Sequence, residues 1–566
     1  MRADRSFERA RRLPTAAAAL LLCVASVAYF YRVGDVPSAS GDEGNWMSLG
    51  HRIHVGLPTR LAPDARFVTL AFARMIALSY RLAGGVSIGA ARAVLGASVL
   101  VGLALVLALT WRMRIPRAGA ALVGVLALHP WTVCWARSVV VPYPIALVTA
   151  VLGPLAWLHA TGAYSDAGAR PAGWRRHVGL VLAGQVLVSG MHFTPFALIP
   201  MLACALWSIA SADGRRSLRT PGPWLALGAA LAHAAPVLWD AFSVLQGAGP
   251  ARRTEEFGPR WRNLVRTILD GYSGEQTLRD YVGDNAHDPL GLTPSRALVL
   301  ATLGVSLWMA LRPRRARDGA AGPAEEALRR FAPLYLGTAL LTFPLVLAPA
   351  RDWWLATIDA ERYLFALLAP GALLVAAATA RGPAAALLLP AALCGYFALG
   401  PDLRAARYFW RGGGPDHGYF SAHRGGGFRG YKVAAGPRSV TRAIHEACRD
   451  EARGGDMVIA FDDYAFHPVR VLIRARPDAN LRSSYLRDAA FPAGQLLCIP
   501  VWPEAMFTPG HIPGHAVEHN RWARDYALRR MDAPRRIAAW TQPNGAPLVE
   551  LYVGRVSAAE AGHRPR

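Results

Sequence analysis

Charged residues are scarce in this chain, and lysine is almost absent from it. Of the 566 residues, 18% are charged and 53% are hydrophobic, and Lys432 is the single lysine. With a mean hydropathy of +0.22, the chain is too apolar for an ordinary soluble protein of this length. The composition therefore predicts a membrane protein that crosses the bilayer several times.

Acidic residues are also few, so the formal net charge is +24. The arginines behind this charge cluster between apolar runs, which is typical of loops that stay on the cytoplasmic side. A nucleic-acid-binding protein would instead gather them on one face or along one helix. We therefore expect no nucleic-acid partner.

Long apolar runs fill most of residues 1–399. A helix needs about 17 to 25 residues to cross a hydrocarbon layer of about 30 Å. The runs predict eleven spans, near 15–32, 90–111, 118–134, 143–160, 178–191, 194–210, 222–241, 294–312, 331–349, 363–380 and 382–399. The fifth is short, but fusing it with the sixth would place the arginine-rich segment 312–317 outside, so two spans are favoured.

The arginine-rich connections alternate, which places the N-terminus in the cytoplasm and residues 400–566 outside. The first run has an alternative as a secretory signal, because its flank is basic and Ser26-Val27-Ala28 resembles a cleavage site. The segment 66–83 carries regularly spaced arginines, so we expect a helix in the outer membrane interface, with a full span as the alternative.

Residues 400–566 differ in character from the rest of the chain. Strand-like runs at 457–461, 495–502, 536–540 and 547–556 predict a soluble domain of mixed α/β type. The predicted fold is thus an all-α polytopic bundle over 1–399 with a C-terminal α/β domain outside the cytoplasm. Cys448 and Cys498 both fall in that domain, where oxidation permits a disulfide, but the sequence leaves their pairing open.

Two adjacent carboxylates follow the first apolar run, in the stretch SASGDEGNW at 38–46. On their own, Asp42 and Glu43 could be solvated loop residues or a helix N-cap. Their place nevertheless resembles that of the acidic motif in the GT-C superfamily of polyprenyl-phosphate-sugar-dependent membrane glycosyltransferases. That superfamily includes protein O-mannosyltransferases and the lipid A aminoarabinose transferase, and its motif stands in the first external loop, ahead of an amphipathic helix.

Further motifs follow in the order that the superfamily shows. The pair His129-Pro130 stands where an Asn-Pro pair is usual, and Arg137 and Tyr143 follow in a short outer loop and at the start of the next span. A late span opens with Arg362-Tyr363. The resemblance covers roughly residues 10–400. The His in place of Asn is a departure, and the resemblance does not extend to the domain after residue 400.

The resemblance implies chemistry on the outer membrane face. Asp42 would take the proton of an acceptor hydroxyl as that oxygen attacks the anomeric carbon, and Glu43 would orient the acceptor, bind a divalent metal or raise the proton affinity of Asp42. The lipid phosphate would be bound by Arg137, Arg362 and Tyr363. Further candidates near the outer ends of spans are His192, Asp240, Asp352 and Asp359.

The implied partners are a polyprenyl-phosphate sugar and a lipid, glycan or protein acceptor, at the cytoplasmic (inner) membrane. One rival function is a transporter or flippase of lipid-linked saccharide, but such proteins place ionisable residues near the bilayer midplane, and no predicted span has an acidic residue there. Another rival is a noncatalytic cell-envelope assembly protein, which would tolerate the loss of Asp42. Arg137 and Arg362 could also be interfacial anchors.

Overall fold

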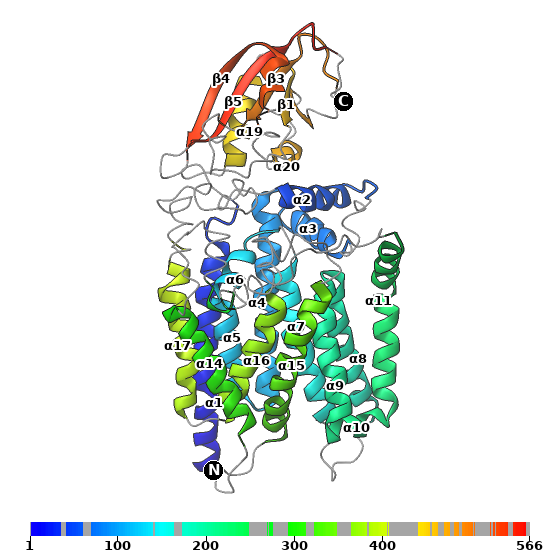
Figure 1. The fold of residues 1–566 in the computed structure, drawn as a ribbon, viewed down its shortest axis with the longest axis vertical. Coiled ribbons are helices and arrows are strands. Elements are labelled where there is room, and N and C mark those ends of the chain that lie inside the picture. Colours follow the sequence, from blue (N-terminus) through cyan, green and yellow to red (C-terminus); the bar gives the residue numbers. More distant parts are fainter. Residues whose placement is uncertain are drawn as a thin grey trace, which may run out of the picture.

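A computed structural model describes most of the chain. It leaves undescribed residues 1, 35–40, 60–69, 140–141, 163–172, 248–268, 270, 275–292, 313–321, 348–363, 382–383, 404–405, 407–439, 453–454, 462–468, 476–479, 486–489, 502, 504–520, 522–523, 527, 542–546 and 562–566. The described residues form a bundle of helices and, beyond one end of it, a small domain with a five-stranded sheet (Figure 1).

Each predicted span contains a helix. These helices are α1 (Arg2–Phe30), α4 (Ile88–Arg112), α5 (Pro116–Leu128), α7 (Tyr143–Gly162), α8 (Gly173–Ser189), α9 (Leu198–Ala210), α11 (Pro221–Gly247), α14 (Pro294–Leu311), α15 (Pro323–Leu347), α16 (Phe365–Arg381) and α17 (Leu388–Leu399). Within the described residues, four stretches are long and apolar enough to cross a membrane, namely Leu13–Phe30, α4, α7 and α14. The full set of eleven spans stays a prediction.

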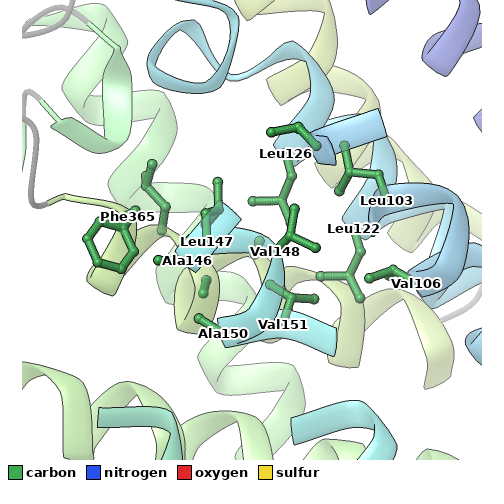
Figure 2. Packing of buried hydrophobic residues seen from close by; sticks show 14 of the residues in the cluster. Leu103, Val106, Leu122, Leu126, Ala146, Leu147, Val148, Ala150, Val151 and Phe365 are labelled. Carbon is green, nitrogen blue, oxygen red and sulfur yellow. The ribbon is translucent and has the colours of Figure 1, made fainter. Parts of the chain in front are cut away.

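The centre of the bundle is an apolar cluster between α4, α5, α7 and α16 (Figure 2). Leu103, Leu122 and Val151 are among its buried members. Helices α4 and α7 approach closely at Gly102, where an added Cβ would lie 2.1 Å from Cγ1 of Val148. A residue without a side chain is therefore required at this crossing.

Two short helices lie across the end of the bundle that faces the sheet domain (Figure 1). These are α2 (Gly41–His54) and α3 (Ala71–Leu82), which pack against each other. The 12 residues of α3 are too few to cross a bilayer. Its length and place agree with the interfacial helix predicted for 66–83.

The C-terminal domain has a mixed sheet with the strand order β2-β1-β3-β5-β4. Strand β1 runs parallel to both β2 and β3, whereas β5 pairs antiparallel with β3 and β4. The strands are β1 (Met457–Phe461), β2 (Leu481–Tyr485), β3 (Leu496–Val501), β4 (Met531–Thr541) and β5 (Pro547–Val556). The four predicted strands are confirmed, and β2 is additional.

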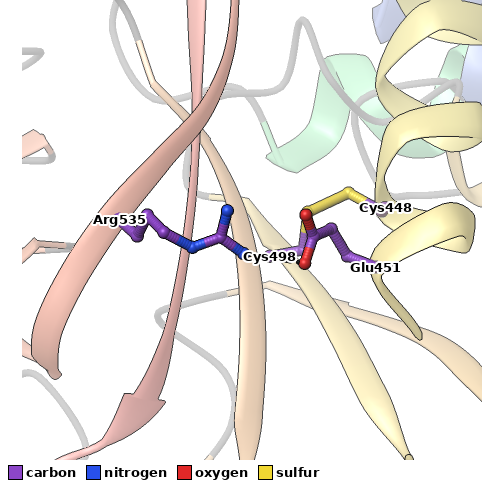
Figure 3. The surroundings of a disulfide bond; sticks show 4 residues. All are labelled: Cys448, Glu451, Cys498 and Arg535. Carbon is purple, nitrogen blue, oxygen red and sulfur yellow. Dashed lines mark hydrogen bonds and ion pairs between the residues drawn. A yellow bond between two sulfur atoms is a disulfide. The ribbon is translucent and has the colours of Figure 1, made fainter. Parts of the chain in front are cut away.

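A disulfide joins a helix of this domain to the middle of its sheet. Cys448 on α19 (Val440–Glu451) is bonded to Cys498 on β3, with 6.0 Å between their Cα atoms. Figure 3 shows this bond close to the ion pair between Glu451 of α19 and Arg535 of β4, whose N and O atoms are 2.9 Å apart. The pairing that the sequence left open is thus formed.

The smaller elements connect these parts. They are α6 (Pro130–Trp135), η2 (Gly190–His192), η3 (Pro195–Ala197), α10 (Ala212–Leu218), η7 (Ala384–Leu387) and α20 (Val469–Ala475). Among them, α20 contacts α2 and so links the C-terminal domain to the bundle.

Candidate active site at the outer end of the bundle

The acidic pair lies in the first turn of α2. This helix begins at Gly41, so Asp42 stands one residue inside it. The structure describes the backbone of Asp42 but not its side chain. The position of Asp42 is therefore set by what holds the first turn of α2.

Glu43 anchors that turn through two charged hydrogen bonds. Its Oε1 accepts from Nε of Arg92 at 2.9 Å, and its Oε2 accepts from Nη2 of Arg92 at 2.7 Å. The two side chains are 1% and 0% exposed, so this forked ion pair is sealed from solvent. Bidentate pairs of this kind fix direction as well as distance.

The same pair reaches two further segments of the chain. The backbone N–H of Val139, shortly before α7, donates to Oε1 of Glu43 at 2.9 Å. Nη1 of Arg92 donates to the carbonyl oxygen of Val33, just after α1, at 3.0 Å. Glu43 and Arg92 thus join α2 and α4 to the segments just after α1 and just before α7 in one network.

Arg137 lies buried in the same region and binds backbone oxygens. Its Nη1 donates to the carbonyl of Ala28 and its Nη2 to the carbonyl of Tyr31, the latter at 2.6 Å. These carbonyls belong to the last turn of α1 and the residue after it, where helix carbonyls lack intrahelical donors. In this structure the guanidinium predicted to bind lipid phosphate holds the end of α1.

His129 caps the short helix that follows it. Its Nδ1 accepts from the backbone N–H of Trp131 at 3.1 Å, which is an N-cap bond for α6. The opposite ring nitrogen, Nε2, lies 3.3 Å from the carbonyl oxygen of Tyr272 and donates to it in this tautomer. The histidine thus caps α6 and also contacts the segment after α11.

The start of α16 lies beside α6 and α7. Phe365 is buried, and its ring lies 5.3 Å from that of Tyr143 and 6.1 Å from that of Trp131. The positions just before it, Arg362 and Tyr363, lie outside the described residues. Two of the further candidate acids, Asp352 and Asp359, are also outside them, and for Asp240 only the backbone in α11 is described.

His192 lies apart from the acidic pair. It ends the single turn η2 between α8 and α9, and its ring centroid is 4.6 Å from that of His233 on α11. His233 is itself bonded to Gln185 at 2.5 Å between Nδ1 and Oε1. Among the described residues, no group of three or more His, Cys, Asp or Glu side chains could hold a metal ion, so a metal stays an open expectation.

Arg92 is the functional residue that sequence reasoning missed. It lies in the fifth position of α4, inside the predicted span at 90–111, and it is fully buried. A charged residue within an apolar span is costly unless it is paired, and it usually marks a functional region. That signal was present in the sequence, although the partner could not be read from it.

No family model matches the chain, and neither does any curated protein. Among solved structures, the chain is similar to ArnT from Cupriavidus metallidurans in the apo state. Identity is 13%, the TM-score is 0.36, and the alignment covers 97% of this chain and 99% of the other. For the same protein bound to undecaprenyl phosphate, identity is again 13%, with a TM-score of 0.40 and coverage of 98% and 100%.

The chain is also similar to the Archaeoglobus fulgidus oligosaccharyltransferase in complex with Zn and sulfate. Here identity is 12% and the TM-score is 0.45, over 96% of this chain and 73% of the other. Both kinds of protein belong to the GT-C superfamily, which is the superfamily that the sequence resembles. These TM-scores are below 0.5, so the function of this chain has to be inferred from its own residues.

Proposed function

We propose that this chain is a membrane glycosyltransferase of the GT-C type. It would move a sugar from a polyprenyl-phosphate carrier to an acceptor hydroxyl on the outer side of the cytoplasmic membrane. The observation that supports this most is the buried network of Glu43 and Arg92, which holds the first turn of α2, and with it the backbone of Asp42, at the end of the bundle that faces the sheet domain.

In the proposed reaction Asp42 is the general base. The acceptor oxygen loses its proton to Asp42 and forms a bond to the anomeric carbon, while the bond from that carbon to the phosphate oxygen breaks. The lipid phosphate leaves with the bonding electrons, and the anomeric centre is inverted. Arg362 and Tyr363 are proposed to bind the phosphate, whose negative charge grows as the bond breaks.

We assign Glu43 and Arg137 to positioning. Both oxygens of Glu43 are engaged in hydrogen bonds, so a second role as a mobile base or acceptor ligand would break a buried ion pair. The two terminal nitrogens of Arg137 donate to backbone carbonyls at the end of α1. These two side chains hold the frame in which Asp42 and the phosphate ligands act.

The proposal includes a topology and a location. The N-terminus would lie in the cytoplasm and the C-terminal α/β domain outside it, in a multi-pass protein of the inner membrane. The disulfide between Cys448 and Cys498 supports the outer location of that domain, because structural disulfides persist in oxidising compartments.

The decisive experiment replaces Asp42 by Asn in the full-length protein. Asp42→Asn keeps the size of the side chain but cannot accept the proton, and loss of a positioned base lowers the rate by about 10² to 10⁴. Sugar transfer is measured as release of free polyprenyl phosphate from a panel of polyprenyl-phosphate sugars, together with binding of the donor lipid. We expect release to collapse while donor binding survives.

Asp213→Asn is the matched control, because Asp213 lies in the short helix α10, between α9 and α11. It should leave both measurements unchanged. Transfer by Asp42→Asn within a few fold of the parent rate would disprove the assignment of Asp42 as the base. Transport of lipid-linked saccharide without release of lipid phosphate would favour the transporter alternative.

A further inference from the structure

Helix α20 packs against two apolar cores. Val469 and Ile473, one helical turn apart, are buried in the core of the sheet domain. Val471 is buried in the apolar cluster of the bundle, and Leu472 packs against the same cluster. Because α20 contacts α2, its remaining face, with Arg470 and Arg474 also one turn apart, lies close to the junction of the two helices.

The C-terminal end of α2 brings basic groups to that junction. Its last turn contains His51, Arg52 and His54. Together with Arg470 and Arg474 they form what we call the junction cluster. None of the five forms an ion pair with any described carboxylate.

Several polar atoms of the junction cluster are buried without a partner in the described part of the chain. Nδ1 of His51, Nδ1 of His54 and Nη1 of Arg474 have almost no exposed surface and make no hydrogen bond there. Nη1 of Arg474 is a donor, and each Nδ1 donates in the tautomer that carries its proton. Buried polar atoms are normally paired, and an unpaired group costs roughly 1 to 3 kcal/mol, so three of them at one junction indicate a missing partner.

The electrostatics of the junction point to an anion. Burial, followed by the neighbouring guanidinium groups of Arg470 and Arg52, lowers the pKa of Arg474. Burial, followed by Arg474 and His54, lowers the pKa of His51. Each group is thus disfavoured in its charged form by its neighbours, and no carboxylate is among the causes. A bound anion would reverse both effects.

We propose that the junction of α2 and α20 is a binding site for a phosphate oxyanion. Two guanidinium groups on one helix face and two imidazoles on the other supply the forked and single donors that phosphate oxygens accept. The anion would join α20 to α2 and so fasten the C-terminal domain to the bundle. His51 lies nine positions beyond Asp42 in α2, which is roughly 13 Å along a helix, so the phosphate site is distinct from the proposed base.

The place of the junction favours the phosphate of an anionic lipid headgroup as the source. Just beyond the cluster, Val55 and Leu57 are 48% and 53% exposed, which provides apolar surface beside a charged site. Such pairing of apolar and basic residues is typical of helices that lie in the membrane interface. Free phosphate shares the chemistry and is separated from the lipid by the experiment.

The test uses the full-length protein in a zwitterionic detergent and measures the thermal midpoint Tm during titration. The probes are phosphatidylglycerol, phosphatidylcholine, inorganic phosphate and chloride, the salts at equal ionic strength. We expect phosphatidylglycerol to raise the Tm at concentrations at least tenfold below those of inorganic phosphate, and chloride to have no effect. If inorganic phosphate raises the Tm and phosphatidylglycerol does not, the site binds an anion but its ligand is a soluble phosphate.

The double variant Arg470→Gln/Arg474→Gln distinguishes arginines that bind an anion from arginines that only support the fold. Without any added anion it should be at least as stable as the parent, because two mutually repelling charges are removed. With phosphatidylglycerol or phosphate its Tm should no longer rise. A merely structural role for these arginines would instead lower the Tm in every buffer.

Arg482→Gln is the matched control, since Arg482 is an exposed arginine of strand β2 in the same domain. It should keep the full response to the anions. An unchanged response in the double variant, or an equal loss in the control, would overturn the proposal. Donor binding and sugar transfer do not enter these readouts, so failure of Asp42 as a base leaves this test intact.

Discussion

At the scale of single residues, the acidic pair separates into two different roles. Asp42 and Glu43 are neighbours in sequence, and composition alone treats them alike. In the structure Glu43 is 1% exposed and paired with Arg92, so it is one of the buried residues that position the first turn of α2. A sequence can suggest that two carboxylates matter, but which one is paired depends on Arg92, 49 positions along the chain.

Removing one partner of the buried ion pair should lower the stability of the fold more than removing both partners. Glu43→Gln leaves the Arg92 guanidinium without its counter-charge in a closed environment, and breaking a buried pair in this way costs about 3 to 5 kcal/mol. Glu43→Gln/Arg92→Met removes both charges, and its cost should be clearly smaller. Unfolding in detergent, measured for the two single variants and the double variant, gives the coupling between the residues.

The matched control is Asp456→Asn, in an ion pair with Arg482 of β2 whose side chains are 59% and 72% exposed. Partly exposed pairs contribute little, so this variant should change stability by about 1 kcal/mol or less. If the changes in unfolding free energy of the two single variants simply add up in the double variant, the two side chains are not coupled. The first turn of α2 must then be held by other contacts.

The roles of single residues were only partly readable from the sequence. Cys448 and Cys498 both fall in the predicted C-terminal domain, but their bond depends on the distance between α19 and β3. His129 could be named as a departure from Asn, yet its capping role follows from the geometry of its Nδ1 to Trp131. Arg362, Tyr363, Asp352 and Asp359 lie outside the described residues, so their roles stay predictions.

At the scale of elements, hydropathy located helices well and short polar elements poorly. Every predicted span contains a helix because a run of apolar residues leaves few other ways to bury its backbone in lipid. Strand β2, with the sequence LRSSY, has too few apolar residues to be recognised, since it pairs only with β1 at the edge of the sheet. The seven residues of α20 are similarly too short to show helical periodicity.

Close helix packing makes a second prediction at this scale. Gly102→Ala would place a Cβ 2.1 Å from Cγ1 of Val148, so α4 and α7 must shift apart. Overpacking of this kind destabilises by about 1 to 3 kcal/mol. Thermal unfolding in detergent should show a lower midpoint for Gly102→Ala and a partial return in Gly102→Ala/Val148→Ala.

Gly228→Ala is the control on α11, because nothing lies within 4 Å of an added Cβ there. This change should be neutral or stabilising by up to about 1 kcal/mol, as alanine favours a helix more than glycine does. Equal losses at positions 102 and 228 would show that glycine is needed for reasons other than the α4 and α7 contact.

At the scale of the whole molecule, the arginine pattern predicts which ends of the helices face the cytoplasm. The structure places the sheet domain beyond the end of the bundle where α2 and α3 lie (Figure 1). The side of the membrane on which this end lies is inferred from the arginine pattern. Domain organisation at residues 1–399 and 400–566 is likewise a proposal, although α20 shows that the two parts touch.

Reporter tags test this orientation. A tag after residue 318 should report the cytoplasm, and tags near 265 and after 500 should report the periplasm or exterior, because the arginine-rich loops are retained inside. Reporter enzymes that are active on only one side of the membrane make the measurement, with a tag at the N-terminus as the cytoplasmic control. A cytoplasmic signal from the tag after 500 would show that the span count is wrong and would remove the outer active site with it.

Because α20 packs into both the core of the bundle and the core of the sheet domain, truncation at residue 399 would expose apolar surface on both parts. A chain ending at residue 399 would leave the apolar surface next to α2 that Val471 and Leu472 now cover open to water. The separated C-terminal domain would expose the apolar side chains of Val471 and Leu472 themselves. Each fragment would then be prone to self-association through this exposed apolar surface.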